Sequence, residues 1–379
     1  MTKFTLPRQD NSLPAPYRGQ SPGGDRGLPE SQYQNYQLAH SPNSSPNVSQ
    51  NFWETEDQSI LSGFTLAESY KLANPSESLE ANMEEALRRS RPLLSQGRLA
   101  DYIPELAKAN PDLLGLTILD TDGTCYQAGD CDKAFTIQSI AKVALLLKAL
   151  QLGGFAQVFS RVGMEPSGAP FSEFTTLGDF SDKPSNPFIN SGAIVLSSFL
   201  AAHMAFEDFL DFLCQLCNNP QLQLDSSVYR SERQTSERNH SLAWELKRLR
   251  LLSADLDLSL DFYTKLCSIE VRPLDLAHFG LCLARGGLDA EGKQLLLAED
   301  VTTTLALMST CGLYDASGEF AVEAGLPAKS GVGGGILAVV PGQYGIGAFG
   351  PALDRNGNSI GGINALKILS HTQGWHVLA

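Results

Sequence analysis

The 379-residue chain lacks features that define several large classes of protein. It has no uninterrupted apolar run near the ~18 residues that read as a membrane span, and residues 1–7 lack the apolar core of a signal peptide. It also lacks an excess of positive charge, because 28 Lys and Arg against 42 Asp and Glu give a formal net charge of −14. Phosphate binding needs basic patches. We therefore expect no nucleic-acid partner, no membrane span and, by default, a cytoplasmic location.

Metal-ligand patterns are missing as well. The six histidines show no ligand spacing, and Cys214 and Cys217 are the only close pair among seven cysteines. No second pair or neighbouring histidine completes a zinc set, so the cysteines are most simply interpreted as buried thiols, with this pair on a core helix. We expect neither a metal nor another cofactor.

Composition divides the chain into two parts. Residues 1–50 are rich in Pro, Ser, Gln, Asn and Gly, and such a segment buries too little apolar surface to offset its ordering entropy. Residues 51–75 carry some apolar side chains and are compatible with weak docking or partner binding. We expect a disordered or weakly ordered polar tail over 1–76 and one globular domain over 77–379.

Turn and strand patterns predict the architecture of that domain. An amphipathic helix is expected at 79–94, and two runs, 114–119 and 124–127, flank a good turn sequence, which indicates a β-hairpin. The stretch 137–310 is mostly helical in pattern. A second hairpin is expected from 335–340 and 343–349, and a short helix at 364–369. Hairpins imply antiparallel pairing, so we predict an α+β fold: one antiparallel sheet built from terminal hairpins plus a large helical subdomain.

The most informative motif is a Ser-x-x-Lys pair, Ser139 and Lys142. On a helix these residues lie one turn apart on the same face, and a desolvated lysine can act as the base that a serine nucleophile needs. Taken alone, the pair is better explained as a helix start with a surface lysine. However, the residues that follow Lys142 are apolar nearly all round the helix up to Gly153, so the helix is expected to be buried and the lysine to be paired or used.

A second motif, Lys329-Ser330-Gly331, opens a glycine-rich stretch. It does not match a phosphate loop, because Ala328 stands where a glycine should precede the lysine, and the glycines precede a strand rather than a helix. It matches better the Lys-Thr-Gly element of penicillin-interacting enzymes, which also carry Ser-x-x-Lys. The alternative is a flexible strand entry.

Together with other stretches, these motifs resemble a known family. The similar stretches are ADYIPEL at 100–106, FTIQSIAK at 135–142, NPFINSGA at 186–193, Ser231-Glu232 with Arg238-Asn239, and GLPAKSGVGGG at 325–335. From about Glu77 onward the chain resembles the bacterial-type serine-dependent glutaminases, whose fold is related to that of serine β-lactamases and transpeptidases. The resemblance implies hydrolysis of L-glutamine to L-glutamate and ammonia without a cofactor, and a homodimer or homotetramer.

The resemblance also assigns roles to individual residues. It implies that Ser139 is the acyl-forming nucleophile, that Lys142 activates it and that Tyr314 shuttles protons. It further implies a substrate-binding set that includes Ser139 and Tyr314 themselves; the other members are Tyr102, Asn190, Glu232, Asn239, Tyr263 and Val332. Glu232 can pair with the α-ammonium of glutamine, and the Val332 N–H with the reacting carbonyl. Lys329, Ser330 and Gly331 would support the site.

Each of these interpretations has a competitor. The polar run 229–239 could be a surface loop, and Tyr102 and Tyr263 could be packing residues. At the level of function, the alternatives are a β-lactamase-like or transpeptidase-like acyl enzyme, a serine amidase for another amide such as that of asparagine, and a non-catalytic amino-acid-binding relative.

Overall fold

The computed structural model describes residues 78–167 and 182–378. The chain divides into two units, Met1–Gly63 and Phe64–Ala379, and all described residues belong to the second. The expected tail at 1–76 therefore lies outside the described residues.

An antiparallel five-stranded sheet forms the centre of this unit. Its order is β2-β1-β8-β7-β6, with β1 at Gly115–Asp120, β2 at Cys125–Gly129, β6 at Ala328–Ser330, β7 at Gly335–Val340 and β8 at Tyr344–Phe349. Both predicted hairpins are present, and they join through the pairing of β1 with β8, in which Gly115 faces Phe349. The predicted α+β architecture is confirmed.

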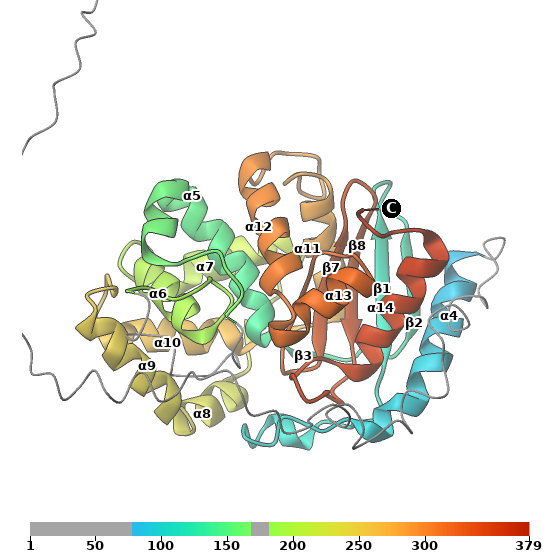
Figure 1. Ribbon diagram of the computed structural model, residues 1–379, viewed down its shortest axis with the longest axis horizontal. Coiled ribbons are helices and arrows are strands. Elements are labelled where there is room, and N and C mark those ends of the chain that lie inside the picture. Colours follow the sequence, from blue (N-terminus) through green and yellow to red (C-terminus); the bar gives the residue numbers. More distant parts are fainter. Residues whose placement is uncertain (1–77, 168–181, 379) are drawn as a thin grey trace, which may run out of the picture. The chain divides into compact units, whose positions relative to one another are not determined.

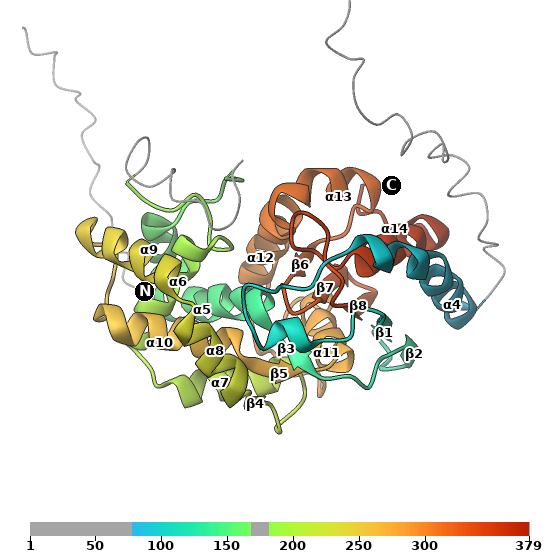
Figure 2. The same ribbon diagram turned by 90° about the horizontal axis from the view of Figure 1, so that it is seen from below.

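Helices cover both faces of the sheet because successive side chains of a strand point to opposite faces. In β7, Ile336 and Ala338 pack into one core with α4 (Leu79–Ser90) and α14 (Ile360–Gln373), whereas Leu337 and Val339 pack into the other core. Helix α11 (Pro273–Ala284) lies on that second face. Figure 2 shows β7 and β8 between α14 and α11.

Glycines allow α11 to approach the sheet closely. A Cβ atom at Gly345 or Gly347 of β8 would clash with the backbone of α11, whose own Gly280 packs against Gly345. The small residues of this strand therefore reflect backbone-to-backbone packing.

The large helical subdomain that the sequence predicted lies at the left in Figure 1, beside the five-stranded sheet. It contains α5 (Ala141–Arg161), α6 (Asn190–Ala201), α7 (Phe206–Leu216), α8 (Ser226–Gln234), α9 (Glu237–Arg248) and α10 (Leu256–Cys267), and α12 (Ala298–Cys311) packs against α5. A small sheet, β3-β5-β4, with β3 at Phe135–Thr136, β5 at Ile269–Val271 and β4 at Gln223–Leu224, was not predicted. Its strands are two or three residues long, too short to leave an alternating pattern.

The element α5 comprises two helices joined at a kink. At the predicted stop, Gly154 has non-helical backbone angles, a φ of 70° and a ψ of 168°, and a second helical stretch follows up to Arg161. Together with the turn before it, the helical segment Gln138–Arg161 is also long and apolar enough to cross a membrane by length and composition, and half of its most apolar part is buried inside the protein. A core helix of a globular domain has the same character.

The helices at the two ends of the domain also differ in length from the prediction. The first ends at Ser90 and continues as the 3₁₀ helix η2 (Arg91–Gln96), which contains Pro92 at its start. The last, α14, has 14 residues, because Ser359 caps it by accepting a hydrogen bond from the Gly362 N–H. Cys125 is exposed, in contrast to the buried thiol predicted, whereas Cys217 is buried.

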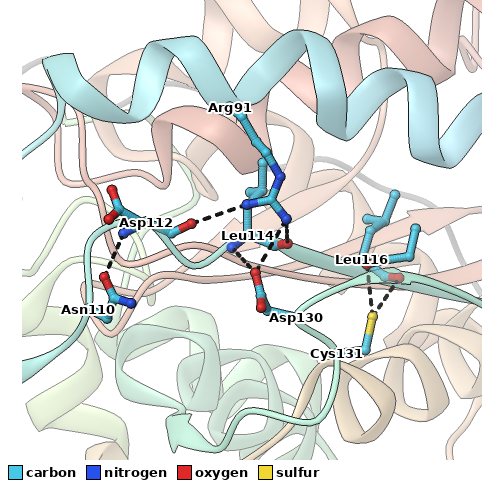
Figure 3. A network of polar contacts seen from close by, with 8 residues as sticks. Arg91, Asn110, Asp112, Leu114, Leu116, Asp130 and Cys131 are labelled. Atoms are coloured by element: carbon cyan, nitrogen blue, oxygen red, sulfur yellow. Dashed lines mark hydrogen bonds and ion pairs between the residues drawn. The ribbon is translucent and has the colours of Figure 1, made fainter.

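Polar contacts fasten η2 to the start of β1 (Figure 3). The Arg91 guanidinium donates hydrogen bonds to the Asp112 carbonyl (3.2 Å) and pairs with Asp130 at 3.4 Å. Asp130 in turn accepts from the Leu114 N–H at 2.9 Å. The contacts anchor the end of the β1–β2 hairpin at which β1 begins and β2 ends.

Candidate active site

The proposed nucleophile lies in a tight turn between the two parts of the fold. Ser139 belongs to the 3₁₀ helix η4 (Gln138–Ile140), directly before α5, and only 8% of its surface is exposed. Gln138 adopts a left-handed φ of 51°. The turn packs against Gly331, where a Cβ atom would lie 2.7 Å from the Ile137 carbonyl oxygen and 3.3 Å from the Ser139 nitrogen. A glycine at 331 is therefore required for this contact.

Lys142 is fully buried in the first turn of α5. Its Nζ donates to Asn190 Oδ1 at 2.7 Å and to the Phe188 carbonyl at 3.3 Å, and it lies 5.7 Å from the centroid of the Tyr263 ring. Burial lowers the pKa of Lys142 to about 8, although the nearby Cys267 and Glu232 act in the opposite direction. A lysine with this pKa is partly neutral near pH 7 and can accept a proton.

Tyr314 and Lys329 form a second pair, in which Lys329 is fully buried and Tyr314 is half-buried. Tyr314 begins the 3₁₀ helix η5 (Tyr314–Ala316), and Lys329 lies on β6 with its Nζ 4.3 Å from the centroid of the Tyr314 ring. Burial raises the pKa of Tyr314 to about 12, while hydrogen bonding with the Ser139 and Ser330 side chains acts to lower it. Burial, and then the charge of Lys142, hold the pKa of Lys329 well below its ordinary value.

Two residues of the polar run 229–239, the predicted substrate-binding residues Glu232 and Asn239, lie on helices. Glu232 lies on α8 and Asn239 on α9, so the surface-loop alternative is wrong for these positions. Glu232 Oε1 accepts a hydrogen bond from Gln138 Nε2 at 2.6 Å, and Asn190 Nδ2 donates to Asn239 Oδ1 at 3.2 Å. Burial raises the pKa of Glu232 to about 7, with the Gln138 hydrogen bond and the charge of Lys142 acting to lower it.

A cavity of about 80 Å³ brings most of the predicted substrate-binding residues together. Its lining comprises Tyr102, Ile103, Gln138, Ser139, Asn190, Glu232, Thr235, Asn239, Tyr263, Cys267 and Val332. Tyr102 is 54% exposed, whereas Tyr263 is buried. The predicted residues outside the lining are Lys142, Tyr314, Lys329, Ser330 and Gly331. A larger cavity of about 390 Å³ borders Tyr314 but is lined by neither Ser139 nor Glu232.

Comparisons with known proteins identify the family of the chain. The model of the glutaminase family matches residues 97–378. The chain belongs to this family. A glutaminase from Alkaliphilus metalliredigens is 45% identical over 301 residues, which cover 78% of this chain and 99% of that protein.

Solved structures of glutaminases have the same serine β-lactamase-like fold. A probable glutaminase from Bacillus subtilis complexed with 6-diazo-5-oxo-L-norleucine is 34% identical, with a TM-score of 0.73, covering 81% of this chain and 99% of that chain. The covalent complex between the B. subtilis glutaminase YbgJ and 5-oxo-L-norleucine, formed by reaction with the same diazo compound, is 36% identical, with a TM-score of 0.71, covering 79% and 98%.

Sequence reasoning missed three polar members of this glutaminase cavity. Gln138 holds Glu232, Cys267 follows Tyr263 by one turn of α10, and Thr235 ends α8. The position of Gln138 directly before the nucleophile was the only available signal. Nothing in the sequence distinguishes Cys267 or Thr235 from packing and surface residues.

Proposed function

We propose that this glutaminase hydrolyses the side-chain amide of L-glutamine through an acyl-enzyme on Ser139. The proposal rests chiefly on one observation: a fully buried lysine with a lowered pKa lies one helical turn from a serine at the edge of a cavity that also holds a half-buried carboxylate. A serine nucleophile needs such a base, and no histidine among the described residues lines this cavity.

The polar groups of the cavity suit the two ends of glutamine. Glu232 pairs with the α-ammonium, since the Gln138 bond leaves its other oxygen available for a charged donor. Asn190, Asn239 and the hydroxyls of Tyr102 and Tyr263 bind the α-carboxylate without adding charge. The amide group is thereby directed toward Ser139.

The reaction then follows from the buried groups. Ser139 Oγ attacks the amide carbon while its proton passes to Lys142, directly or by way of Tyr314. The N–H groups of Ser139 and Val332 stabilise the developing oxyanion. The proton is returned to the leaving nitrogen, ammonia departs, and a water molecule cleaves the ester to release glutamate and restore Ser139.

Lys329, Ser330 and Gly331 support this chemistry. Lys329 Nζ donates to the Ser330 carbonyl at 2.7 Å and places a cationic or polar head over the Tyr314 ring. The charge of Lys142 also disfavours protonation of Lys329, which keeps Lys329 closer to its neutral form.

We further propose that the enzyme acts as a cytoplasmic homodimer or homotetramer, with 77–379 as the catalytic domain. Solution mass by light scattering, for the full chain and for a variant that lacks 1–76, tests both statements. A monomeric and fully active catalytic domain would contradict the oligomer.

The primary experiment measures ammonia and glutamate release from L-glutamine by the wild type and by Ser139→Ala. We expect release by the wild type alone, and a covalent adduct of 6-diazo-5-oxo-L-norleucine on the wild type alone by intact-mass spectrometry. Equal turnover by both proteins would overturn the nucleophile assignment. Preference for asparagine or for a chromogenic β-lactam over glutamine would overturn the substrate.

A further inference from the structure

Among the described residues, two acceptors bind the buried amine of Lys142, and both belong to one short turn. Lys142 Nζ donates to the Phe188 carbonyl at 3.3 Å and to Asn190 Oδ1 at 2.7 Å. Asn190 is the first residue of α6, and Phe188 lies two residues before it. The turn at 186–190, which leads into α6, therefore decides how the head of the lysine is oriented.

The side chain of Asn186 holds this turn. Its Oδ1 accepts from the N–H groups of Phe188 at 2.9 Å and Ile189 at 3.2 Å, and its Nδ2 donates to the Glu165 carbonyl at 2.9 Å. Asn186 is only 2% exposed, so water has little access to replace these hydrogen bonds. A buried N–H group that loses its acceptor is costly, and the turn is therefore kept in this conformation by Asn186.

The bond to Ile189 acts directly on the acceptor of Lys142, because the Ile189 N–H and the Phe188 carbonyl belong to the same peptide unit. In a planar trans peptide these two groups point in opposite directions. Asn186 holds the N–H end, and the carbonyl end points to Lys142 Nζ. The start of α6 packs closely on the same residue, since a Cβ atom at Gly192 would lie 2.0 Å from the Asn186 carbonyl oxygen.

The orientation of the Lys142 amine matters for the proton that leaves Ser139. A protonated lysine has three N–H donors, whereas the neutral amine has two and a lone pair. The two acceptors of the turn can engage both N–H groups of the neutral amine, which leaves the lone pair at the remaining tetrahedral position. In the proposed reaction this lone pair takes the proton of the nucleophile and forms a third N–H bond. That bond breaks again when the proton passes to the leaving nitrogen.

We propose that Asn186 is a positioning residue for this base. It holds the 188–189 peptide so that the Phe188 carbonyl, together with Asn190 Oδ1, keeps the lone pair of Lys142 available to the proton of Ser139. Because this role serves the proton transfer from Ser139, it rests on the proposed function. Asn186 does not line the substrate cavity, and the family resemblance assigns it no role.

The test measures steady-state hydrolysis of L-glutamine by the full-length wild type and by Asn186→Ala over about pH 6–10. The variant removes the acceptor of the Ile189 N–H. We expect kcat at its high-pH plateau to fall about tenfold, because a general base must be aligned with the proton that it takes. KM should change less than about threefold, because Asn190 has a second anchor, its Nδ2 donating to Asn239 Oδ1 at 3.2 Å.

The pH profile separates a positioning role from a loss of folded protein. A carbonyl acceptor stabilises an ammonium more than a neutral amine, so a weaker bond to the Phe188 carbonyl lowers the pKa of Lys142. The rise of kcat with pH should therefore move to lower pH by about half a unit or more in Asn186→Ala. A smaller folded fraction would lower kcat at every pH without moving the profile.

Two further variants complete the experiment. Asn186→Asp keeps an acceptor for the N–H groups of the turn and removes only the donor to the Glu165 carbonyl, so its plateau kcat should stay within about threefold of the wild type. Asn219→Ala is the matched control away from the site. Asn219 Oδ1 likewise accepts from a backbone N–H two residues ahead, that of Gln221 at 2.9 Å, and its Nδ2 donates to Asp275 Oδ1 at 2.9 Å. This control should keep the wild-type kcat, KM and pH profile.

The outcomes distinguish this role from the proposed function. Suppose that the wild type hydrolyses glutamine and Ser139→Ala does not. A wild-type kcat in Asn186→Ala, a lowered kcat with an unmoved pH profile, or an equal loss in Asn219→Ala would then overturn the positioning role alone. Should Asn186→Ala not fold, Asn186→Asp decides, because a tenfold loss in a variant that keeps the acceptor would overturn it as well.

If the wild type does not hydrolyse glutamine, the proposed function fails, and the hold of Asn186 on Lys142 is judged by urea unfolding at about pH 6.5 and about pH 9.5. A further lowered pKa of Lys142 in the folded protein makes the unfolding free energy rise more steeply with pH. The rise between the two pH values should therefore be larger for Asn186→Ala than for the wild type. Equal rises would overturn the hold of Asn186 on the lysine.

Discussion

Replacement of Lys142 by methionine isolates the free-energy cost of its buried charge. Burial lowers the pKa of Lys142 from 10.5 to about 8. The folded protein therefore holds this proton less tightly than the unfolded chain does, and protonation favours unfolding. The destabilisation is complete below pH 8, decreases as the pH rises toward 10.5, and is absent above that value.

The magnitude follows from the size of the shift. A pKa lowered by this amount corresponds to about 3 kcal/mol of destabilisation near neutral pH. The methionine side chain also removes the donors to Asn190 Oδ1 and the Phe188 carbonyl, which costs about 1–3 kcal/mol independent of pH. These two effects on the unfolding free energy have opposite signs, so the net change at a single pH is not predicted. The way in which that change varies with pH is predicted, because only the buried charge depends on pH.

The assay is urea unfolding of the wild type and Lys142→Met at two pH values. From about pH 6.5 to about pH 9.5, the unfolding free energy of the wild type should rise by about 2 kcal/mol relative to the variant. Removal of Lys142 also relieves part of the pKa depression of Lys329, which changes the difference in the same direction.

Lys265→Met is the control for this experiment. Its hydrogen bond to Asp261 raises the pKa of Lys265, so any stabilisation by that lysine is complete below pH 10.5. The difference between the wild type and Lys265→Met should therefore stay constant over the same pH range. A constant difference for Lys142→Met as well would refute the reasoning, since it would mean that the buried lysine titrates at its ordinary pKa.

Two further substitutions test other parts of the site. Glu232→Gln should raise KM for glutamine at least tenfold, because the ammonium loses its charged partner. It should also abolish the rise in kcat/KM as the pH increases through about 7, where the wild-type carboxyl ionises. An unchanged pH profile would contradict the assignment of Glu232. Gly331→Ala should lower kcat more than tenfold, because the new methyl group displaces the Ser139 turn. The control Gly318→Ala, on a helix with open space around the residue, should leave kcat unchanged. Equal kcat values for the two variants in a steady-state assay would argue against the contact of Gly331 with the Ser139 turn.

The sequence predicted those features that have a local signature. The two hairpins follow from alternating strands around turn residues, and the burial of Lys142 follows from the apolar residues after it. Glu232 and Asn239 are different, because their polar run has the composition of a surface and only the family resemblance assigned them. Their positions depend on how α8 and α9 pack, which no local pattern encodes.

The supporting contacts could not be predicted for a related reason. Asn358 lies in a polar loop that reads as a turn, and it meets Ser330 and Leu313 across 28 and 45 positions of sequence. Gln138 contacts Glu232 across 94 positions. Such contacts exist only after the sheet and the helical subdomain have packed together, so a single sequence carries no pattern that marks them.

The charges of the site explain how substrate binding favours the reaction. In the empty site, the negative charge of Glu232 is one of the influences that raise the pKa of Lys142 and keep it protonated. In the proposed mechanism, binding of glutamine places an ammonium beside Glu232 and neutralises that influence, so the pKa of Lys142 falls further toward its buried limit. The lysine then loses its proton when the substrate is in place. An amide without an α-ammonium, such as glutaramate, should consequently react slowly even at saturation, with a kcat that rises with pH at a higher apparent pKa than the kcat for glutamine. Identical pH profiles for the two substrates would show that Glu232 and Lys142 act independently.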